Sequence, residues 1–495
     1  MGIVLKQSFK NTLFIYLGFL IGGINTLFLY TRFLEDEYYG LVTFLLSSSN
    51  LLMPLIAIGI HHTIVKFFSS YFTKIEKDKF LSSVLFLPLL IAIPMGFLGN
   101  VFYEEISSYL SVKNPVIKEY TFVIYLIAFA CAYFEIFYAW AKVQFQSVFG
   151  NILKELWNRV VVMILLFAVY FEFISKAEFI YYLTGAYFLR MFVMMVYAFK
   201  LYFPKFTLSR PDNFNEILRF SIYIILAGSA GAIILDIDKF MIPGKESLEK
   251  AAYYSVAVFI GSFIEAPSRA MLNILQPLTS KTLNEDNLKE VGSLYKKSSI
   301  NLLLISGFFF VIINSNIQQL FSLLPKEYAG GALVVFMISL LKLYNGFLGN
   351  NGAIINNSKF YKIVLPLSLA MAFSVYFLNK LFYYELDMGT DGLALATLIV
   401  IFAANTFRLI FVNKKFSITP FTNKSFVMFI TIIVFYLLFN FWDFPVDHIY
   451  VFKFPIHPII NIVLKSILIT VLYLFLIIKL KISDDINTLF KRFYK

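Results

Sequence analysis

Polar and charged side chains recur at helical spacing inside the long apolar stretches of this chain. The clearest series consists of Ser262, Glu265, Arg269, Asn273 and Gln276, with Pro267 between the two charges. Residues three or four positions apart share one face of a helix. A charged group inside a membrane is costly and persists where it faces protein or water. The series therefore predicts one wall of a water-filled cavity.

Three other apolar stretches carry similar polar stripes. They are Gly18, Gly22, Asn25 and Arg32; Asn50, Pro54, Ala57 and His61, with Lys66 nearby; and Lys342, Asn345, Gly349, Gly352 and Asn356. The charges on these stripes are mainly basic, so the predicted cavity is cationic. Lys and Arg in a medium of low dielectric hold a phosphate or pyrophosphate through charge-assisted hydrogen bonds. Lys342 has no acidic neighbour in its own stretch and is the strongest single candidate for such a contact.

The remaining charges within the apolar stretches have competing interpretations. Glu265 and Arg269 lie four residues apart, so they either neutralise each other or contact a substrate. Glu135 and Arg190 are expected to form a structural pair. Asp236 is grouped with them as a structural or coupling charge.

Basic residues near the ends of the stretches need not face the cavity. Arg32 and Lys66 either line the cavity or extend to the lipid headgroups. Lys465, in the last stretch, is expected to face another helix or lipid headgroups.

Metal and cofactor chemistry are not indicated by the histidines or the cysteine. His61 and His62 are adjacent, about 100° apart on a helix, and cannot hold one ion from a single face. His448 and His457 fall in an expected outer loop, and the single cysteine, Cys131, excludes a disulfide within the chain. No metal site or cofactor is expected, and the sequence does not specify a coupling ion, H⁺ or Na⁺.

The apolar stretches themselves define the fold class. The 495 residues are 59% hydrophobic and 15% charged, and the mean hydropathy is +0.77. About 20 apolar residues span the hydrocarbon of a bilayer as a helix. We therefore predict an all-α integral membrane protein with 14 transmembrane helices, at 11–31, 41–65, 80–103, 117–141, 152–171, 178–202, 217–238, 250–276, 296–320, 330–354, 361–382, 390–412, 424–442 and 457–480.

Charge placement predicts the topology. Most of the 42 Lys and Arg residues fall in alternate connecting segments, which the positive-inside rule places in the cytoplasm together with both termini. The net charge of +12 is scattered over short segments without a basic aromatic patch, so no nucleic-acid partner is expected.

The two halves of the chain share a pattern. Tyr38-Tyr39 precedes Pro54, and Tyr253-Tyr254 precedes Pro267 at a similar spacing. The sequence predicts two pseudo-symmetric six-helix lobes at 1–202 and 217–412, a cytoplasmic linker at 203–216, and a C-terminal helix pair with a cytoplasmic tail at 413–495. Paired halves with proline-interrupted helices are typical of alternating-access transporters.

Several of these segments resemble the Wzx-type oligosaccharide flippases, the polysaccharide transporter branch of the multidrug/oligosaccharidyl-lipid/polysaccharide exporter (MOP, MATE-like) superfamily. They are Ser8-Phe9-Lys10-Asn11, the run from Arg32 to Leu41, the run from Gly59 to Phe68, Asp236-Ile237-Asp238-Lys239-Phe240 and Ala252-Tyr253-Tyr254-Ser255.

The resemblance implies a flippase that moves an undecaprenyl-pyrophosphate-type oligosaccharide from the cytoplasmic to the outer leaflet for polysaccharide (lipopolysaccharide/O-antigen) biosynthesis. It implies a cationic cavity lined by the first, second, seventh and eighth helices, a monomer in a bacterial inner membrane, and polysaccharide polymerase and glycosyltransferases as partners. It implies no bond making or breaking, so the chain is not expected to be an enzyme. A cation-coupled multidrug exporter, a lipid II flippase and a membrane polymerase or glycosyltransferase remain as alternatives.

Overall fold

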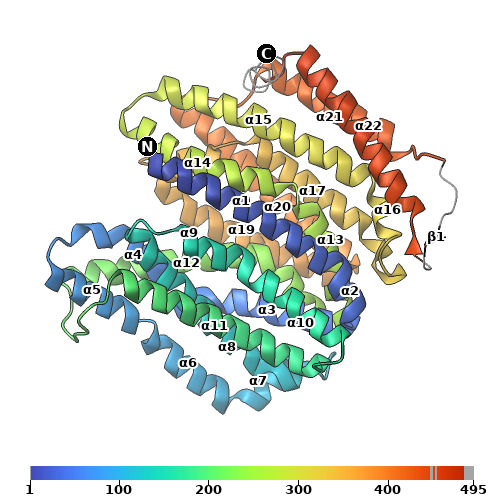
Figure 1. The fold of residues 1–495 in the computed structure, drawn as a ribbon. Coiled ribbons are helices and arrows are strands. Elements are labelled where there is room, and N and C mark those ends of the chain that lie inside the picture. Colours follow the sequence, from blue (N-terminus) through green and yellow to red (C-terminus); the bar gives the residue numbers. More distant parts are fainter. Residues whose placement is uncertain (1, 446–449, 452–453, 484–495) are drawn as a thin grey trace. The chain divides into compact units, whose positions relative to one another are not determined.

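The helices of the chain group into two units. The computed structural model describes residues 2–445, 450–451 and 454–483. The first unit consists of Met1–Ser255 with Leu365–Leu393, and the second of Val256–Val364 with Ala394–Lys495. Figure 1 labels the elements.

Helices of the first unit come mainly from the N-terminal half. They are α1 (Gly2–Ile24), η1 (Asn25–Leu29), α2 (Tyr30–Phe33), α3 (Asp36–Ala57), α4 (Ile60–Phe67), η2 (Phe68–Ser70), α5 (Lys74–Phe86), α6 (Leu89–Val101), α7 (Tyr103–Leu110), α8 (Ile117–Val143), α9 (Val148–Ile152), η3 (Leu153–Trp157), α10 (Asn158–Tyr170), α11 (Lys176–Leu201), α12 (Phe214–Met241), η4 (Ile242–Gly244), α19 (Val364–Asn379) and η7 (Lys380–Glu385). Two helices continue from one unit into the other, α13 (Leu248–Ser262) and α20 (Gly389–Phe416).

The second unit holds the remaining elements. They are α14 (Glu265–Asn284), α15 (Leu288–Ser315), α16 (Ile317–Phe321), η5 (Lys326–Gly331), α17 (Ala332–Phe347), α18 (Asn351–Asn356), η6 (Tyr361–Ile363), α21 (Asn423–Asn440), the short antiparallel strands β1 (Tyr450–Val451) and β2 (Phe454–Pro455), and α22 (His457–Lys479). The predicted lobes divide the chain differently from these units, since α12 and α19 belong to the first unit, and the lobe boundaries stay a prediction.

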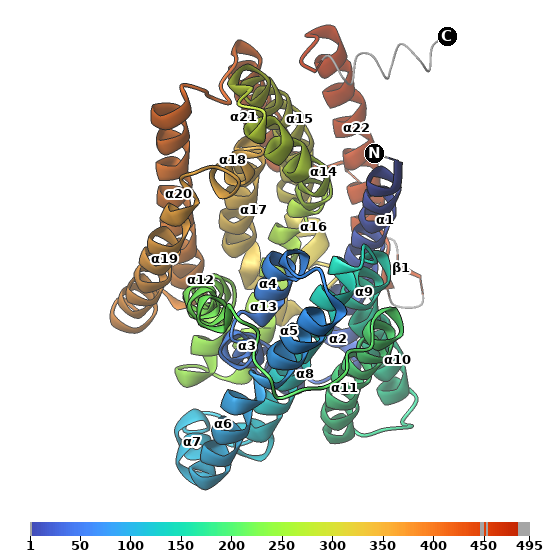
Figure 2. The ribbon, with the colours of Figure 1, turned by 90° about the vertical axis from the view of Figure 1, so that its left-hand side faces the viewer.

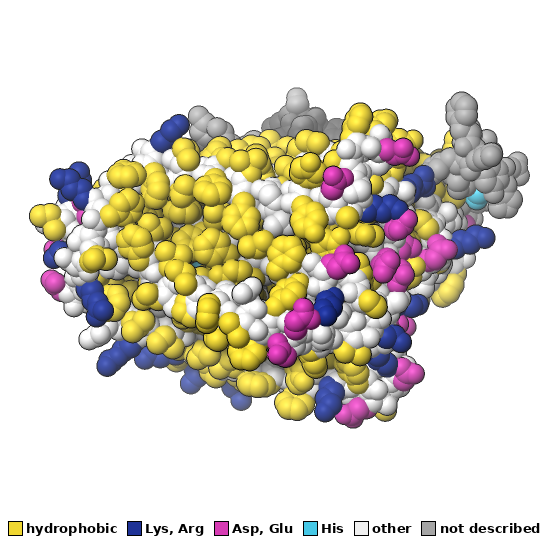
Figure 3. Space-filling model, turned by 90° about the horizontal axis from the view of Figure 1, so that it is seen from below, with side chains coloured by type: hydrophobic (Ala, Val, Ile, Leu, Met, Phe, Trp, Pro, Cys, Tyr) yellow, Lys and Arg dark blue, Asp and Glu magenta, His cyan; other side chains and the backbone are white. Residues whose placement is uncertain are grey.

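The all-helical membrane class is confirmed. Within the described residues, twelve helices are long and apolar enough to cross a membrane, and each overlaps a predicted span. The predicted span 152–171 carries Lys154, Glu155 and Arg159, and 250–276 is divided between α13 and α14, so neither is among the twelve. A broad apolar field occupies the face drawn in Figure 3, with charged side chains gathered toward its edges.

One helix forms the centre of each unit. In the first, α8 lies between α3 and α11, as Figure 2 shows, and Trp140 on α8 is fully buried. In the second, α15 packs against α14, α17 and α21. The Tyr473 hydroxyl of α22 donates a hydrogen bond to the Leu304 carbonyl of α15 over 2.8 Å. Most residues in the middle of both central helices are buried, as expected of helices that are surrounded by protein.

Helix breaks occur close to both prolines that the repeat pattern singled out. Pro54 has no backbone N–H, which weakens the end of α3. The helix ends at Ala57, and left-handed Ile58 and Gly59 connect it to α4. Pro267 lies in the first turn of α14, where a missing N–H costs least, directly after the break between α13 and α14.

Gly40 allows a close approach between α3 and the start of α13. A Cβ atom at this position would lie 1.9 Å from the Leu248 carbonyl oxygen, which is backbone and cannot rotate away. Gly40→Ala is therefore expected to lower the free energy of unfolding by about 1–3 kcal/mol, the usual cost of overpacking. Gly185→Ala on α11, where a Cβ meets nothing within 4 Å, is the matched control and should be neutral or slightly stabilising. Thermal unfolding of the two purified variants compares them, and equal stability would contradict the steric argument.

Candidate functional site

Asn50 and Asp236, both predicted from the sequence, lie together in the first unit. The Asn50 side-chain amide on α3 donates to Asp236 Oδ2 on α12 over 3.2 Å, and Lys239 Nζ lies 3.4 Å from Asp236 Oδ1. A predicted cavity residue thus contacts a predicted coupling charge. The carboxylate is neutralised within one unit, as a charge in an apolar helix requires.

A second carboxylate of α12 joins three helices. It was not among the predicted site residues. Buried Asp238 accepts hydrogen bonds from the Tyr254 hydroxyl over 2.6 Å and from the Asn379 amide over 2.7 Å. These partners come from α13 and α19. The sequence does indicate this residue, because Asp238 is a charge at the end of the predicted span 217–238.

Asn25 joins the π-helical turn η1 to the start of α10, directly after the π-helical turn η3. It begins η1, and its amide donates to the Arg159 carbonyl at the start of α10 over 2.7 Å. Arg159 pairs with Glu155 of η3 over 3.5 Å, and its guanidinium lies 5.5 Å from the centre of the Phe19 ring. A Cβ on Gly18 would meet Arg159, so this glycine admits the arginine beside α1. Such turns are frequent at functional sites. Arg159 was missed, although it falls inside the predicted span 152–171.

The predicted pairing of Glu135 with Arg190 is wrong. Glu135 on α8 accepts from Lys154 Nζ of η3 over 2.5 Å, and Lys142 lies within electrostatic range of the same carboxylate. The Arg190 guanidinium instead lies 4.2 Å from the centre of the Phe134 ring and donates to Cys131 Sγ over 3.4 Å. Arg190 therefore meets α8 one turn away from Glu135, where aromatic and sulfur atoms surround the cation.

Arg32, His61 and Lys66 lie toward helix ends. Arg32 and Lys66 are exposed, and Lys66 Nζ stands 3.8 Å from the centre of the Phe220 ring. The His61 and His62 rings are 4.2 Å apart, and His61 Nδ1 is buried without a hydrogen-bond partner. Among the described residues no group of three or more His, Cys, Asp or Glu could hold a metal; His448 lies outside them.

In the second unit, Lys342 and Glu265 form an ion pair. Lys342 on α17 donates to Glu265 Oε2 at the N-terminus of α14. The end of a helix with free N–H groups favours a carboxylate there. The side chains are 13% and 37% exposed, so neither is sealed from a ligand. Arg269, half-buried, follows one turn later on α14, and the side chain of Asn273 lies outside the described part of the chain.

The polar stripe of Lys342 extends to α20. Asn405 of α20 donates to Asn345 Oδ1 of α17, and Arg408 donates to Asn405 Oδ1 over 3.3 Å. Arg408 was not among the predicted site residues, although it falls inside the predicted span 390–412 and, like Arg269, is a charge within an apolar stretch. Lys342, Arg269 and Arg408 thus place three cations on helices of one unit.

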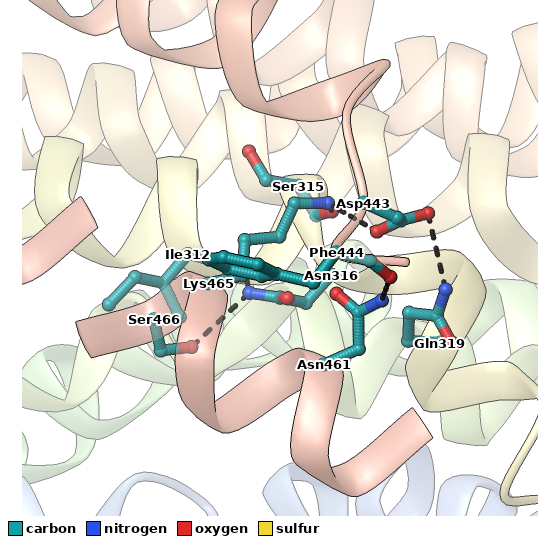
Figure 4. Close-up of polar contacts among 9 residues, drawn as sticks. All are labelled: Ile312, Ser315, Asn316, Gln319, Asp443, Phe444, Asn461, Lys465 and Ser466. Carbon is teal, nitrogen blue, oxygen red and sulfur yellow. Dashed lines mark hydrogen bonds and ion pairs between the residues drawn. The ribbon is translucent and has the colours of Figure 1, made fainter. Parts of the chain in front are cut away.

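A separate polar network surrounds Lys465 of α22. Its ammonium donates to the Ser315 carbonyl over 2.6 Å and to Asp443 Oδ1 over 2.8 Å, and its side chain is 1% exposed. Figure 4 shows Gln319 holding the other oxygen of Asp443 and Asn461 donating to the Phe444 carbonyl. Lys465 therefore faces neighbouring protein segments, not headgroups, and its contacts are structural.

These arrangements can bind an anion without catalysing a reaction. An ammonium held by a partly exposed carboxylate, as in the pair of Lys342 with Glu265, can exchange that partner for a phosphate oxygen. Ion pairs of this kind, found in both units, form and break without any change in covalent bonds.

Solved structures with a similar fold are membrane transporters. The lipid II flippase MurJ in an inward closed conformation matches with a TM-score of 0.67 at 15% identity, over 94% of this chain and 99% of that one. An inward-facing multidrug resistance MATE family transporter of the MOP superfamily matches with 0.62 at 14% identity, over 81% and 94%. A MOP superfamily transporter from Pyrococcus furiosus, whose binding pocket is described as having reverse polarity, matches with 0.60 at 13% identity, over 84% and 95%. At these identities the likeness shows the fold.

The comparison with protein-family models says more about this chain than the similarity of fold does. No protein with a curated description matches the chain. The family described as polysaccharide biosynthesis protein matches residues 4–283, which is more than half of the 495 residues. This multi-pass helical membrane protein, with the fold of MOP transporters, therefore belongs to the polysaccharide biosynthesis protein family.

Proposed function

We propose that this protein is an alternating-access flippase for a polyprenyl-pyrophosphate-linked oligosaccharide, which it moves from the cytoplasmic to the outer leaflet. The observation that carries the proposal is the partly exposed ion pair between Lys342, on a candidate membrane span, and Glu265 of α14 in a polysaccharide-biosynthesis family member. A pyrophosphate can replace the Glu265 carboxylate as the partner of Lys342. Arg269 of the same unit would contact the same anion, and Arg32 and Lys66 of the first unit are proposed as further contacts for the substrate.

In this mechanism the sugars cross in water and the polyprenyl tail stays in lipid. Arg and Lys hold the pyrophosphate through charge-assisted hydrogen bonds while the headgroup leaves one leaflet. No bond is made or broken. Resetting requires an energy source, a gradient of H⁺ or Na⁺ or the membrane potential, and Asp236 and Glu135 are the proposed coupling carboxylates.

The proposal also covers the membrane, the orientation and the partners of the protein. The protein would act as a monomer in a bacterial inner membrane with both termini in the cytoplasm, beside membrane lipids, polysaccharide polymerase and glycosyltransferases. The positive-inside pattern of its 42 Lys and Arg supports this orientation.

Two other substrates are favoured by specific observations. The similarity of fold to MurJ favours lipid II, and the similarity to MATE transporters favours a cationic drug. A cationic drug requires unpaired carboxylates, whereas Glu135, Glu265 and Asp236 each have a basic partner within the unit that holds them. This favours an anionic substrate.

Transport in proteoliposomes distinguishes these substrates. The purified protein is reconstituted with a fluorescent polyprenyl-pyrophosphate oligosaccharide, with lipid II or with a cationic dye, and substrate movement is measured with a membrane-impermeant quencher. We expect exposure of the oligosaccharide lipid at a rate at least ten times that of empty vesicles. Movement of the dye alone would overturn the proposal, and preference for lipid II would replace its substrate.

A further inference from the structure

The first unit contains an apolar cavity that the proposed substrate contacts leave unused. It has a volume of about 940 Å³ and lies between α3, α6, α7 and α8, with Phe240 contributed by α12. Pockets of about 300–1,000 Å³ accommodate whole organic molecules. Among the described residues that line the cavity, none is charged.

The hydroxyl groups in the lining are already used. Ser48 donates to the Phe44 carbonyl over 2.7 Å and Thr121 to the Ile117 carbonyl over 2.8 Å. Tyr103 donates to the Lys118 carbonyl and Tyr125 to the Ala92 carbonyl, each over 2.7 Å. These hydroxyl protons are therefore not available to a ligand. Asn100 is the one amide side chain among the described lining residues, so a sugar or a drug cation would lose most of its hydration in this cavity with few partners to replace it.

The cavity is continuous with the lipid-facing surface of the first unit. Leu90 and Leu98 of α6, Phe102, Ile106 of α7 and Phe122 of α8 line it and are exposed. In a membrane-spanning segment such side chains contact hydrocarbon, and Lys74–Val101 is one of the twelve candidate spans. The helices α6 and α7 lie at the bottom of Figure 1, and Figure 3 views the apolar surface from that side.

We propose that this cavity binds a segment of the polyprenyl chain of the transported lipid. The inference rests on the proposed function, because that function supplies a long, branched hydrocarbon chain that must stay in lipid while its headgroup moves. An apolar cavity open to the bilayer can retain such a chain near the transporter. The cavity is lined by the aromatic rings of Phe102, Tyr103, Phe122, Tyr125 and Phe240. These rings can pack against the methyl branches of an isoprenoid chain, which a straight acyl chain lacks.

A glycine offers a direct way to fill the cavity. Gly99 lines it, and a Cβ at this position meets nothing within 4 Å, so a large side chain can enter the empty space without displacing its neighbours. Gly185 of α11 is also helical, exposed and without a neighbour within 4 Å of its Cβ, but it does not line the cavity. Gly99→Trp and Gly185→Trp therefore form a matched pair.

Photo-crosslinking tests the occupant. Full-length protein in nanodiscs is irradiated with a diazirine-bearing polyprenyl phosphate, and the labelled peptides are identified by mass spectrometry. We expect labelling of the segments that line the cavity, 48–52, 90–126 and Phe240, at least ten-fold weaker in Gly99→Trp and unchanged in Gly185→Trp. Excess unlabelled polyprenyl phosphate should remove the label, and excess phosphatidylglycerol should not.

Three results would overturn the inference: labelling elsewhere, equal labelling of the two variants, or equal competition by phosphatidylglycerol, which would indicate a general lipid site. The transport assay separates this failure from that of the proposed function. A protein that flips the oligosaccharide lipid but lacks label at the cavity refutes the cavity assignment alone. Label at the cavity without flipping refutes the function and leaves polyprenyl binding in place.

Discussion

Asp443→Asn is expected to lower the free energy of unfolding by about 3–5 kcal/mol, the cost of leaving a buried charge without its partner. The Lys465 side chain is 1% exposed, and its ammonium would keep neutral acceptors in place of the carboxylate: the Ser315 carbonyl and the amide oxygen that the substitution introduces. Lys465→Met should cost less, about 1–2 kcal/mol, because the Asp443 side chain is 47% exposed and regains water when the ammonium is removed. The two partners of one ion pair are thus predicted to differ in effect.

The double variant Lys465→Met/Asp443→Asn sharpens this test. With the buried ammonium removed, the carboxylate change should add little, so the double variant is expected to be more stable than Asp443→Asn alone. Lys479→Met, at an exposed position of the same helix, controls for loss of a lysine from α22. Thermal and denaturant unfolding in detergent measure the series. Equal losses for Asp443→Asn and Lys465→Met would show that burial of the ammonium does not dominate.

Lys342→Met is expected to slow flipping about 10- to 100-fold at sub-saturating glycolipid. A hydrogen bond to a charged group contributes about 1.5–3 kcal/mol, which corresponds to that range. Glu265→Gln should not slow binding, because it removes the carboxylate that competes with pyrophosphate for Lys342. The initial rate of leaflet exposure in proteoliposomes measures both variants.

The alternative is that the pair of Lys342 and Glu265 only holds α14 against α17. Each single change would then destabilise the protein and reduce transport equally, and the double variant Lys342→Met/Glu265→Gln would resemble either one. Lys326→Met in η5, an exposed position just before α17, controls for a change in net charge. Similar losses of transport in the two single variants, matched by similar losses of stability, would assign the pair a structural role.

Much of the architecture follows from the sequence, because hydrophobicity acts over whole segments. In the described part of the chain, all twelve helices that are long and apolar enough to span the membrane overlap predicted spans. Helix breaks lie close to Pro54 and Pro267, where a missing N–H disfavours a continuous helix. The rule that a charge in an apolar helix faces protein or water selected Lys342, Glu265 and Asp236, which the structure places in ion pairs.

Partner choice was decided by the tertiary structure. Sequence spacing identifies the face of a helix on which a charge lies. Which residue pairs with that charge depends on which neighbouring helix places a partner at the same level along the helix axis. Arg190 therefore meets the turn of α8 that contains Cys131, while Lys154 reaches Glu135 from the π-helical turn η3. Lys465 finds its partners where α22 meets the end of α15 and the segment that follows α21, which brings Asp443 to it. Such contacts join residues far apart in the chain, and only the packed helices determine them.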